Sequence, residues 1–132
     1  MKFKTMMVIK AVVCLLLGVP IVLVPAFMYS IFGASLDSGG TFAAREYGAA
    51  MIGILLITWY GRFVPEGPIR WALALGLCVY DAIGFVISAI ATLTGVLNVL
   101  GWLIALLYLL LAIGFGYFLV RSQQPVAQPG AA

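Results

Sequence analysis

Histidine is absent from this chain, and charged residues are scarce. The 132 residues include 7 Lys or Arg and 4 Asp or Glu, or 8% of the chain, whereas soluble domains carry about 25%. Apolar residues make up 65%. This composition excludes a soluble globular domain, a disordered chain and a nucleic-acid-binding protein. It indicates a single integral membrane domain.

The lack of histidine removes the most common ligand of haem, zinc and copper and the usual general base of hydrolytic triads. The two cysteines, Cys14 and Cys78, lie in separate apolar runs and do not form a C-x-x-C pair. A thiol–disulfide relay therefore has no motif. With no nucleophile–base pair, metal-ligand set or phosphate-binding loop apparent, the sequence predicts no enzymatic activity, no metal site and no cofactor.

Four apolar segments are long enough to cross a bilayer, which takes roughly 20 helical residues. They run over about 11–29, 43–61, 71–92 and 96–120. A helix satisfies its own backbone hydrogen bonds, as lipid requires. Because short connections make neighbouring helices antiparallel, we expect an all-α, up-down-up-down four-helix membrane bundle over residues 1–121. A flexible tail over 122–132 is expected to follow it.

The positive charges predict the orientation in the membrane. If the chain crosses four times, six of the seven cations lie on one side, and Arg45 alone lies on the other. The six are Lys2, Lys4 and Lys10 before the first segment, Arg62 and Arg70 between the second and third, and Arg121 after the fourth. The positive-inside rule then places both termini and the 61–70 connection in the cytoplasm.

Two prolines, Pro20 and Pro25, interrupt the first apolar segment. Each removes a backbone donor and clashes with the preceding turn. Two outcomes are open. The helix kinks and continues, or it ends near Val24 and residues 25–32 form a second, tilted piece at the outer interface.

Three ionisable residues, Arg45, Glu46 and Asp81, fall inside the apolar segments. An Asp at mid-membrane costs about 2.5–3.5 kcal/mol and normally faces a partner in the bundle interior. At about 1.5 Å per residue, Asp81 lies about 16 Å above Arg70 and Arg45 about 25 Å above Arg62. A long Arg side chain spans most of the difference. We therefore predict a polar cluster of Arg45, Glu46 and Asp81 in the outer half of the bundle.

Other polar residues lie near this predicted cluster. Tyr47, Tyr80 and Asn98 are candidate hydrogen-bond partners, and Ser88 shares a helix face with Asp81. Three interpretations are open. The cluster fixes helix register, or it binds a polar head group or carries protons, or Arg45 and Glu46 reach the outer surface while Asp81 faces another subunit.

The segment Ala43-Ala-Arg-Glu-Tyr-Gly-Ala-Ala50 and the run Asn98-Val-Leu-Gly-Trp102 open the second and fourth spans. With the four-span pattern, they make the chain similar in general plan to small DoxX-like bacterial inner-membrane proteins. That resemblance implies the fold above, a location in the bacterial inner membrane, and no catalytic residues. A more distant resemblance, through Arg45 and Glu46, is to the glutathione-linked MAPEG enzymes.

These observations favour a non-enzymatic scaffold or accessory subunit, packed in the lipid bilayer against itself or a larger membrane complex. The alternative is a bundle that binds or transports a lipid-like, quinone-like or proton-coupled solute with Asp81, Arg45 and Glu46. The intramembrane Asp supports this alternative.

Overall fold

The computed structural model describes residues 1–122, and over that range the regular elements are all helices. They are α1 (Phe3–Leu23), α2 (Pro25–Ile31), α3 (Ser38–Gly61), α4 (Pro68–Leu93) and α5 (Gly101–Arg121). The four long helices, α1, α3, α4 and α5, are long and apolar enough to cross a membrane. The prediction of an all-α membrane protein is confirmed. The predicted flexible tail, apart from Ser122, lies outside the described residues.

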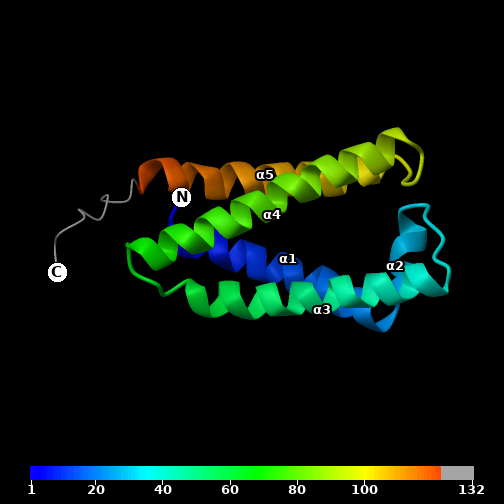
Figure 1. Cartoon of the computed structure of the whole chain (residues 1–132), viewed down its shortest axis with the longest axis horizontal. Helices are drawn as coiled ribbons and strands as arrows, with labels where there is room; N and C mark the ends of the chain where they lie inside the picture. The colour runs from blue at the N-terminus through cyan, green and yellow to red at the C-terminus, as the bar shows by residue number, and fades with distance from the viewer. Residues whose placement is uncertain (123–132) are drawn as a thin grey trace.

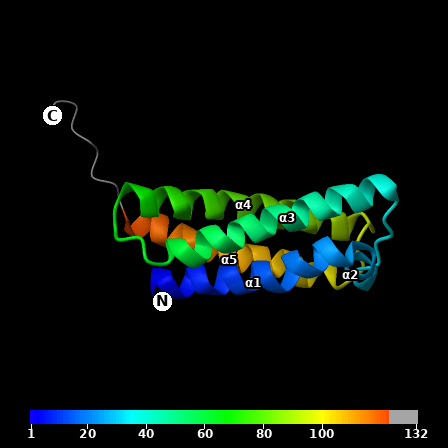
Figure 2. The ribbon, with the colours of Figure 1, turned by 90° about the horizontal axis from the view of Figure 1, so that it is seen from below.

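The long helices run along the long axis of the molecule, and consecutive ones are joined at alternate ends (Figure 1). We call the end where α1 begins and α5 stops the terminal end, and the end that carries α2 the distal end. The helices associate as two pairs, α1 with α3 and α4 with α5 (Figure 1). Seen from below in Figure 2, α1 and α3 lie in front of the other pair.

The first membrane helix begins earlier than the sequence analysis expected. It starts at Phe3 instead of near residue 11, so Lys10 lies inside it. It stops at Leu23, where the backbone N–H of Val24 still bonds to the carbonyl of Pro20 at 2.8 Å. Pro25 then occupies the first turn of α2, a position that needs no N–H donor. The second of the two predicted outcomes is therefore found: α1 ends near Val24, and the short helix α2 follows it.

The last span also differs, because α5 begins at Gly101 instead of near residue 96. The preceding α4 ends at Leu93, and Gly95 follows with a φ of +78°. This left-handed conformation suits glycine and stops a helix. Residues up to Leu100 therefore form the connection at the distal end.

Glycines let α1 and α3 approach closely. A Cβ added to Gly48 would lie 2.7 Å from Val22 Cγ2 and 2.9 Å from the Gly18 carbonyl oxygen. A Cβ on Gly18 would lie 2.9 Å from Met51 Cβ. Small residues at such crossings are the usual basis of helix association in lipid.

The two helix pairs meet through an apolar cluster in the terminal half of the bundle. It combines side chains of α1, α4 and α5: Phe3, Met6, Met7, Ala74, Leu77, Leu111, Phe115 and Phe118. All are at most 8% exposed. The distal half of the same interface is not filled in this way, and the candidate site lies there.

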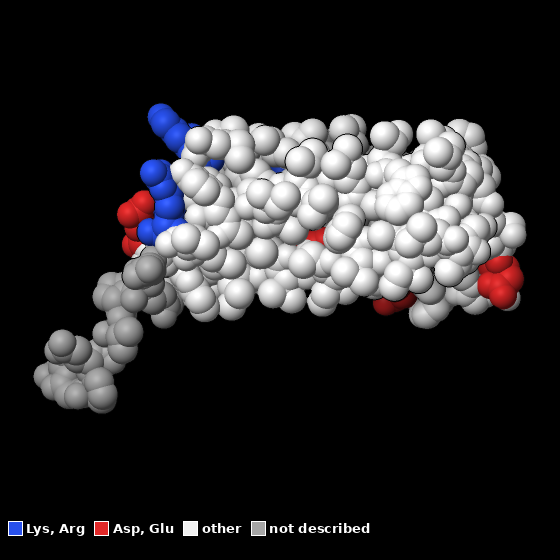
Figure 3. Space-filling view, turned by 90° about the horizontal axis from the view of Figure 1, so that it is seen from above, with Lys and Arg blue, Asp and Glu red and all other residues white. Residues whose placement is uncertain are grey.

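On the face seen in Figure 3, the surface between the two ends is almost uncharged. Large apolar side chains are exposed along it, among them Leu16 (65%), Leu103 (62%) and Ile87 (62%). In water such a surface would drive aggregation, whereas lipid tails solvate it. Exposed apolar side chains between the two ends are expected of a multi-pass membrane protein.

Candidate functional site

A buried ion pair joins the two helix pairs. The ammonium of Lys10, on α1, donates a hydrogen bond to Oδ1 of Asp81, on α4. Lys10 is 1% exposed and Asp81 is 0% exposed. The other carboxylate oxygen, Oδ2, is buried and accepts no hydrogen bond from the described residues. The pair therefore ties α1 to α4 at mid-bundle and leaves one strong acceptor in the interior.

Aromatic rings complete the surroundings of the Lys10 ammonium. Its nitrogen lies 4.6 Å from the ring centroid of Tyr80 and 5.7 Å from that of Tyr108. Both distances are within the roughly 6 Å over which a ring face attracts a cation. One carboxylate and two ring faces thus replace the water that a lysine normally holds, which is how a buried ammonium is tolerated.

Three tyrosine hydroxyls gather beside the ion pair. The hydroxyls of Tyr47 and Tyr108 share a hydrogen bond, and the Tyr80 hydroxyl donates to that of Tyr47 at 3.4 Å. The Tyr108 ring lies over Gly84, where an added Cβ would come within 2.7 Å of it. Because α3, α4 and α5 each supply one tyrosine, the cluster forms only when the two helix pairs are assembled.

An apolar cavity of about 500 Å³ occupies the distal half of the interface. Its walls come from α1, α2, α4, α5 and the two distal connections, with Leu17, Ile21, Met28, Ile87, Ala91 and Leu107 among them. Tyr47 and Tyr108 also line it, and so do Tyr29 and Ser88. The volume lies in the range of small-molecule sites, about 300–1,000 Å³. Tyr47 and Tyr108 thus connect this apolar space to the tyrosine cluster beside the Lys10–Asp81 pair.

The predicted cluster of Arg45, Glu46 and Asp81 does not form. Arg45 is exposed, and its Nε donates to the carbonyl of Val22 at 3.3 Å. That carbonyl belongs to the last turn of α1, where no intrahelical donor remains and a cation is favourable. Glu46 is exposed and forms no ion pair with a described residue. Asp81 is paired with Lys10 instead.

The predicted supporting residues divide into two groups. Tyr47 and Tyr80 join the tyrosine cluster, and Ser88 is buried at the cavity wall. Asn98 lies elsewhere, at the distal end. Its side-chain nitrogen donates to the Ile31 carbonyl at 3.0 Å and its backbone N–H to the Phe32 carbonyl at 2.7 Å. Asn98 therefore closes the distal end of the bundle.

Lys10 and Tyr108 are the site residues that sequence reasoning missed. The buried positions of α1 are Phe3, Met6, Met7, Lys10, Ala11, Cys14, Gly18 and Ile21, which form one helical stripe. Lys10 is in the middle of that stripe, and Tyr108 follows the buried Gly101 and Ala105 on α5. Helical periodicity extended back to Phe3 would have placed Lys10 inside the bundle.

The site can hold an amphiphile through apolar contact and tyrosine hydrogen bonds. Within residues 1–122, no group of three or more Cys, Asp and Glu side chains is close enough to hold a metal ion. Each tyrosine hydroxyl can donate and accept, so a carbonyl or a hydroxyl of a ligand can replace the bond between Tyr47 and Tyr108.

No protein-family model, curated protein or solved structure matches this chain. The resemblances to DoxX-like proteins and, more distantly, to MAPEG enzymes therefore stay predictions from sequence.

Proposed function

We propose that this protein binds a lipid-like or quinone-like molecule inside a four-helix up-down-up-down membrane bundle and does not convert it chemically. The observation that supports this proposal is the distal cavity of about 500 Å³, lined mostly by apolar side chains and also by Tyr47 and Tyr108, whose hydroxyls share a hydrogen bond. A molecule with an apolar body and one hydrogen-bonding head group fits that distribution.

The head group of this ligand is uncharged. The side chains that line the cavity include three tyrosines and two serines, and none carries a formal charge. The nearby Lys10 and Asp81 neutralise each other, so they offer no net charge to a phosphate or an ammonium group. A carbonyl or hydroxyl head avoids the cost of burying an unpaired ion. Quinones and monoacylglycerols have such heads.

The proposed setting is the inner membrane of a bacterium, with both chain ends in the cytoplasm. Lys2, Lys4, Arg62, Arg70 and Arg121 line one pocket at the terminal end. Arg45 contacts the last turn of α1, toward the distal end. This asymmetry favours a cytoplasmic terminal end under the positive-inside rule. The cavity then lies in the outer half of the bilayer, and its exposed wall residue Ile87 gives a ligand access from lipid.

Filling the cavity is expected to abolish binding. Ala91 lines it, so Ala91→Phe would occupy the space of the ligand body. Ala82 is exposed on the same helix and does not line the cavity, which makes Ala82→Phe the matched control. Purified protein in detergent would be titrated with a short-tailed quinone and with a monoacylglycerol, and the thermal midpoint followed. At about 100 times Kd a ligand stabilises by about 2.7 kcal/mol. We expect the ligand to raise the thermal midpoint of the wild type and of Ala82→Phe, and to leave that of Ala91→Phe unchanged.

The head-group contact can be tested separately. Tyr108→Phe removes the hydroxyl and keeps the ring, and we expect a loss of about 0.5–1.5 kcal/mol in binding, a factor of roughly 2 to 13. If Ala91→Phe still binds both probes as the wild type does, the cavity is not the site. If neither probe shifts the wild-type midpoint and no lipid co-purifies with it, the binding proposal fails.

The scaffold or accessory-subunit role is the second candidate, supported by small residues on open surface. A Cβ added at Gly53 or at Gly76 would meet nothing within 4 Å, and both glycines are exposed. Such surfaces allow another membrane helix to approach. Purification in a mild detergent distinguishes the two candidates. A stoichiometric partner chain supports the subunit role, and a monodisperse protein that retains lipid supports binding.

A further inference from the structure

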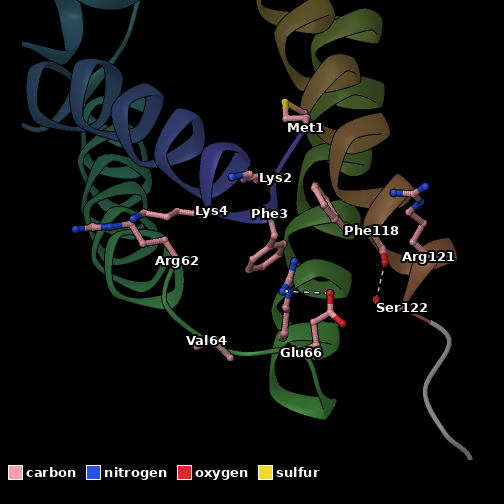
Figure 4. Close-up of a pocket in the computed structure, with 11 residues that line it drawn as sticks. Met1, Lys2, Phe3, Lys4, Arg62, Val64, Glu66, Phe118, Arg121 and Ser122 are labelled. Atoms are coloured by element: carbon pink, nitrogen blue, oxygen red, sulfur yellow. Dashed lines mark hydrogen bonds and ion pairs between the residues drawn. The ribbon is translucent and has the colours of Figure 1, made fainter.

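A second pocket, of about 420 Å³, lies at the terminal end of the bundle, whereas the apolar cavity lies in the distal half. Figure 4 shows its lining side chains arriving from the start of α1, the connection after α3, the start of α4 and the end of α5. Five of these side chains are cationic, and we call them the cationic basin: Lys2, Lys4, Arg62, Arg70 and Arg121. The positive-inside rule explains cations at this end but does not require them to line one hollow.

Aromatic rings position the cations of the basin. The Arg70 guanidinium lies 4.3 Å from the ring centroid of Phe3, and that of Arg121 lies 5.1 Å from Tyr117. Lys4 and Arg62 both stack on Phe63, at 5.2 and 4.3 Å. Arg62 also stacks on Trp59 at 3.5 Å, and its Nη1 donates to the Trp59 carbonyl at 2.5 Å. Stacking uses the face of a guanidinium, so its remaining in-plane N–H groups can donate to another partner. Those N–H groups match the oxygens of a phosphate.

Little negative charge opposes the basin. Glu66 is the one carboxylate among the residues that line the pocket. It lies 3.7 Å from Arg70, and its side chain is 85% exposed, so this ion pair is weak. The other three Asp and Glu side chains of the chain lie elsewhere: Asp37 and Glu46 belong to the distal part of the fold, and Asp81 is paired with Lys10. The pocket therefore carries a clear excess of positive charge.

Exposed apolar side chains surround the pocket on the outside of the bundle. Phe63 (63% exposed), Ile69 (68%) and Val120 (78%) lie at the same ends of α3, α4 and α5 as the basin cations. The basin thus sits where four apolar helices meet water, at head-group depth. A ligand there can place oxygens on the cations and a hydrocarbon tail along the helices.

We propose that the cationic basin binds the phosphodiester of an anionic phospholipid of the cytoplasmic leaflet, as basic pockets between membrane helices do. This site is separate from the apolar cavity and takes a charged head group instead of an uncharged one. It rests on the orientation proposed above and not on ligand binding in the cavity.

The test is a titration of the purified full chain in a neutral mild detergent. The probes are short-chain phosphatidylglycerol, phosphatidylcholine with the same tails, and inorganic phosphate, each detected by native mass spectrometry or intrinsic fluorescence. We expect phosphatidylglycerol to bind more tightly than phosphatidylcholine, inorganic phosphate to compete poorly, and added salt to weaken binding. The double variant Arg70→Gln/Arg121→Gln is expected to lose about thirty-fold in affinity for phosphatidylglycerol, from the loss of two cations.

Arg45→Gln is the matched control, since it removes a cation from outside the basin. Its affinity for phosphatidylglycerol should equal that of the wild type. If Arg70→Gln/Arg121→Gln unfolds, Lys2→Gln/Lys4→Gln, at the exposed start of α1, provides the same test with little effect on packing. Equal binding of the two lipids, equal losses in Arg45→Gln and the basin variants, or competition by inorganic phosphate as strong as that of phosphatidylglycerol would each overturn the proposal.

Discussion

Lys10→Met alone is expected to destabilise the bundle by about 3–5 kcal/mol, the usual loss when one partner of a buried ion pair is removed. The carboxylate of Asp81 is 0% exposed, and its Oδ1 accepts a hydrogen bond from Lys10. Without the ammonium, both carboxylate oxygens would be buried with no partner among the described residues. Thermal or denaturant unfolding of the purified protein in detergent measures the loss. Asp81→Leu alone should cost a similar amount, because it strands the ammonium.

The double variant Lys10→Met/Asp81→Leu separates the cost of an unpaired charge from the value of the pair. Replacing both members of a buried pair with apolar residues of similar size is often neutral or stabilising by about 1–4 kcal/mol. We therefore expect the double variant to recover most of the stability that each single variant loses. Additive losses in the double variant would contradict the pairing, and so would a Lys10→Met protein as stable as the wild type.

Gly48→Ala is expected to destabilise the α1–α3 pair by about 1–3 kcal/mol, the usual cost of overpacking. The added Cβ would lie 2.9 Å from the Gly18 carbonyl oxygen and 3.0 Å from the backbone nitrogen of Val22. Because these atoms belong to the backbone of α1, the two helices must move apart. Unfolding in detergent, or loss of the folded species on size exclusion, reports the effect.

Gly53→Ala is the matched control on the same helix. Nothing lies within 4 Å of a Cβ added there, so the substitution meets no steric cost. Alanine favours a helix over glycine by about 1 kcal/mol, and Gly53→Ala should be neutral or slightly stabilising. Equal stability changes in the two variants would show that α1 and α3 do not cross at Gly48.

Composition and apolar runs predicted the class of fold because they report directly on what lipid tolerates. A chain with 8% charged residues and four long apolar segments has few alternatives to membrane helices. Several small residues also lie along α3, which suits close helix packing. They did not show which of them is used, and Gly48 is buried against α1 whereas Gly53 is exposed. Helix rotation decides that difference, and it depends on the neighbouring helices.

The candidate site was predicted in part, and the failure has a specific cause. Lys10 was counted with Lys2 and Lys4 as a flanking cation, which left Asp81 without its partner and made Arg45 the nearest substitute. The structure starts α1 at Phe3, so Lys10 lies about 10 Å into the helix. A charged residue near the start of an apolar run usually marks the end of a membrane span. Local composition therefore placed Lys10 outside the first helix. The helical spacing of the residues that are buried on α1 would have predicted that Lys10 faces the bundle interior.

The cavity was beyond sequence reasoning for a different reason. It exists because the end of α1 at Leu23, the short α2 and the two distal connections leave the distal part of the interface unfilled. Its polar lining needs Tyr47 from α3 and Tyr108 from α5, which are 61 residues apart in the chain. Only the assembled packing of the two helix pairs brings them together.

The ion pair also imposes an order on biosynthesis. Asp81 lies 71 residues after Lys10, and at about 5–20 residues per second the ribosome needs roughly 4 to 14 s to add it. During that interval the Lys10 ammonium has no Asp81 to pair with, and its long side chain can extend toward water at the terminal end of α1. The arrival of α4 then draws the lysine inward. The nascent first helix is thus a transient amphiphile that becomes fully embedded only when the third crossing is complete.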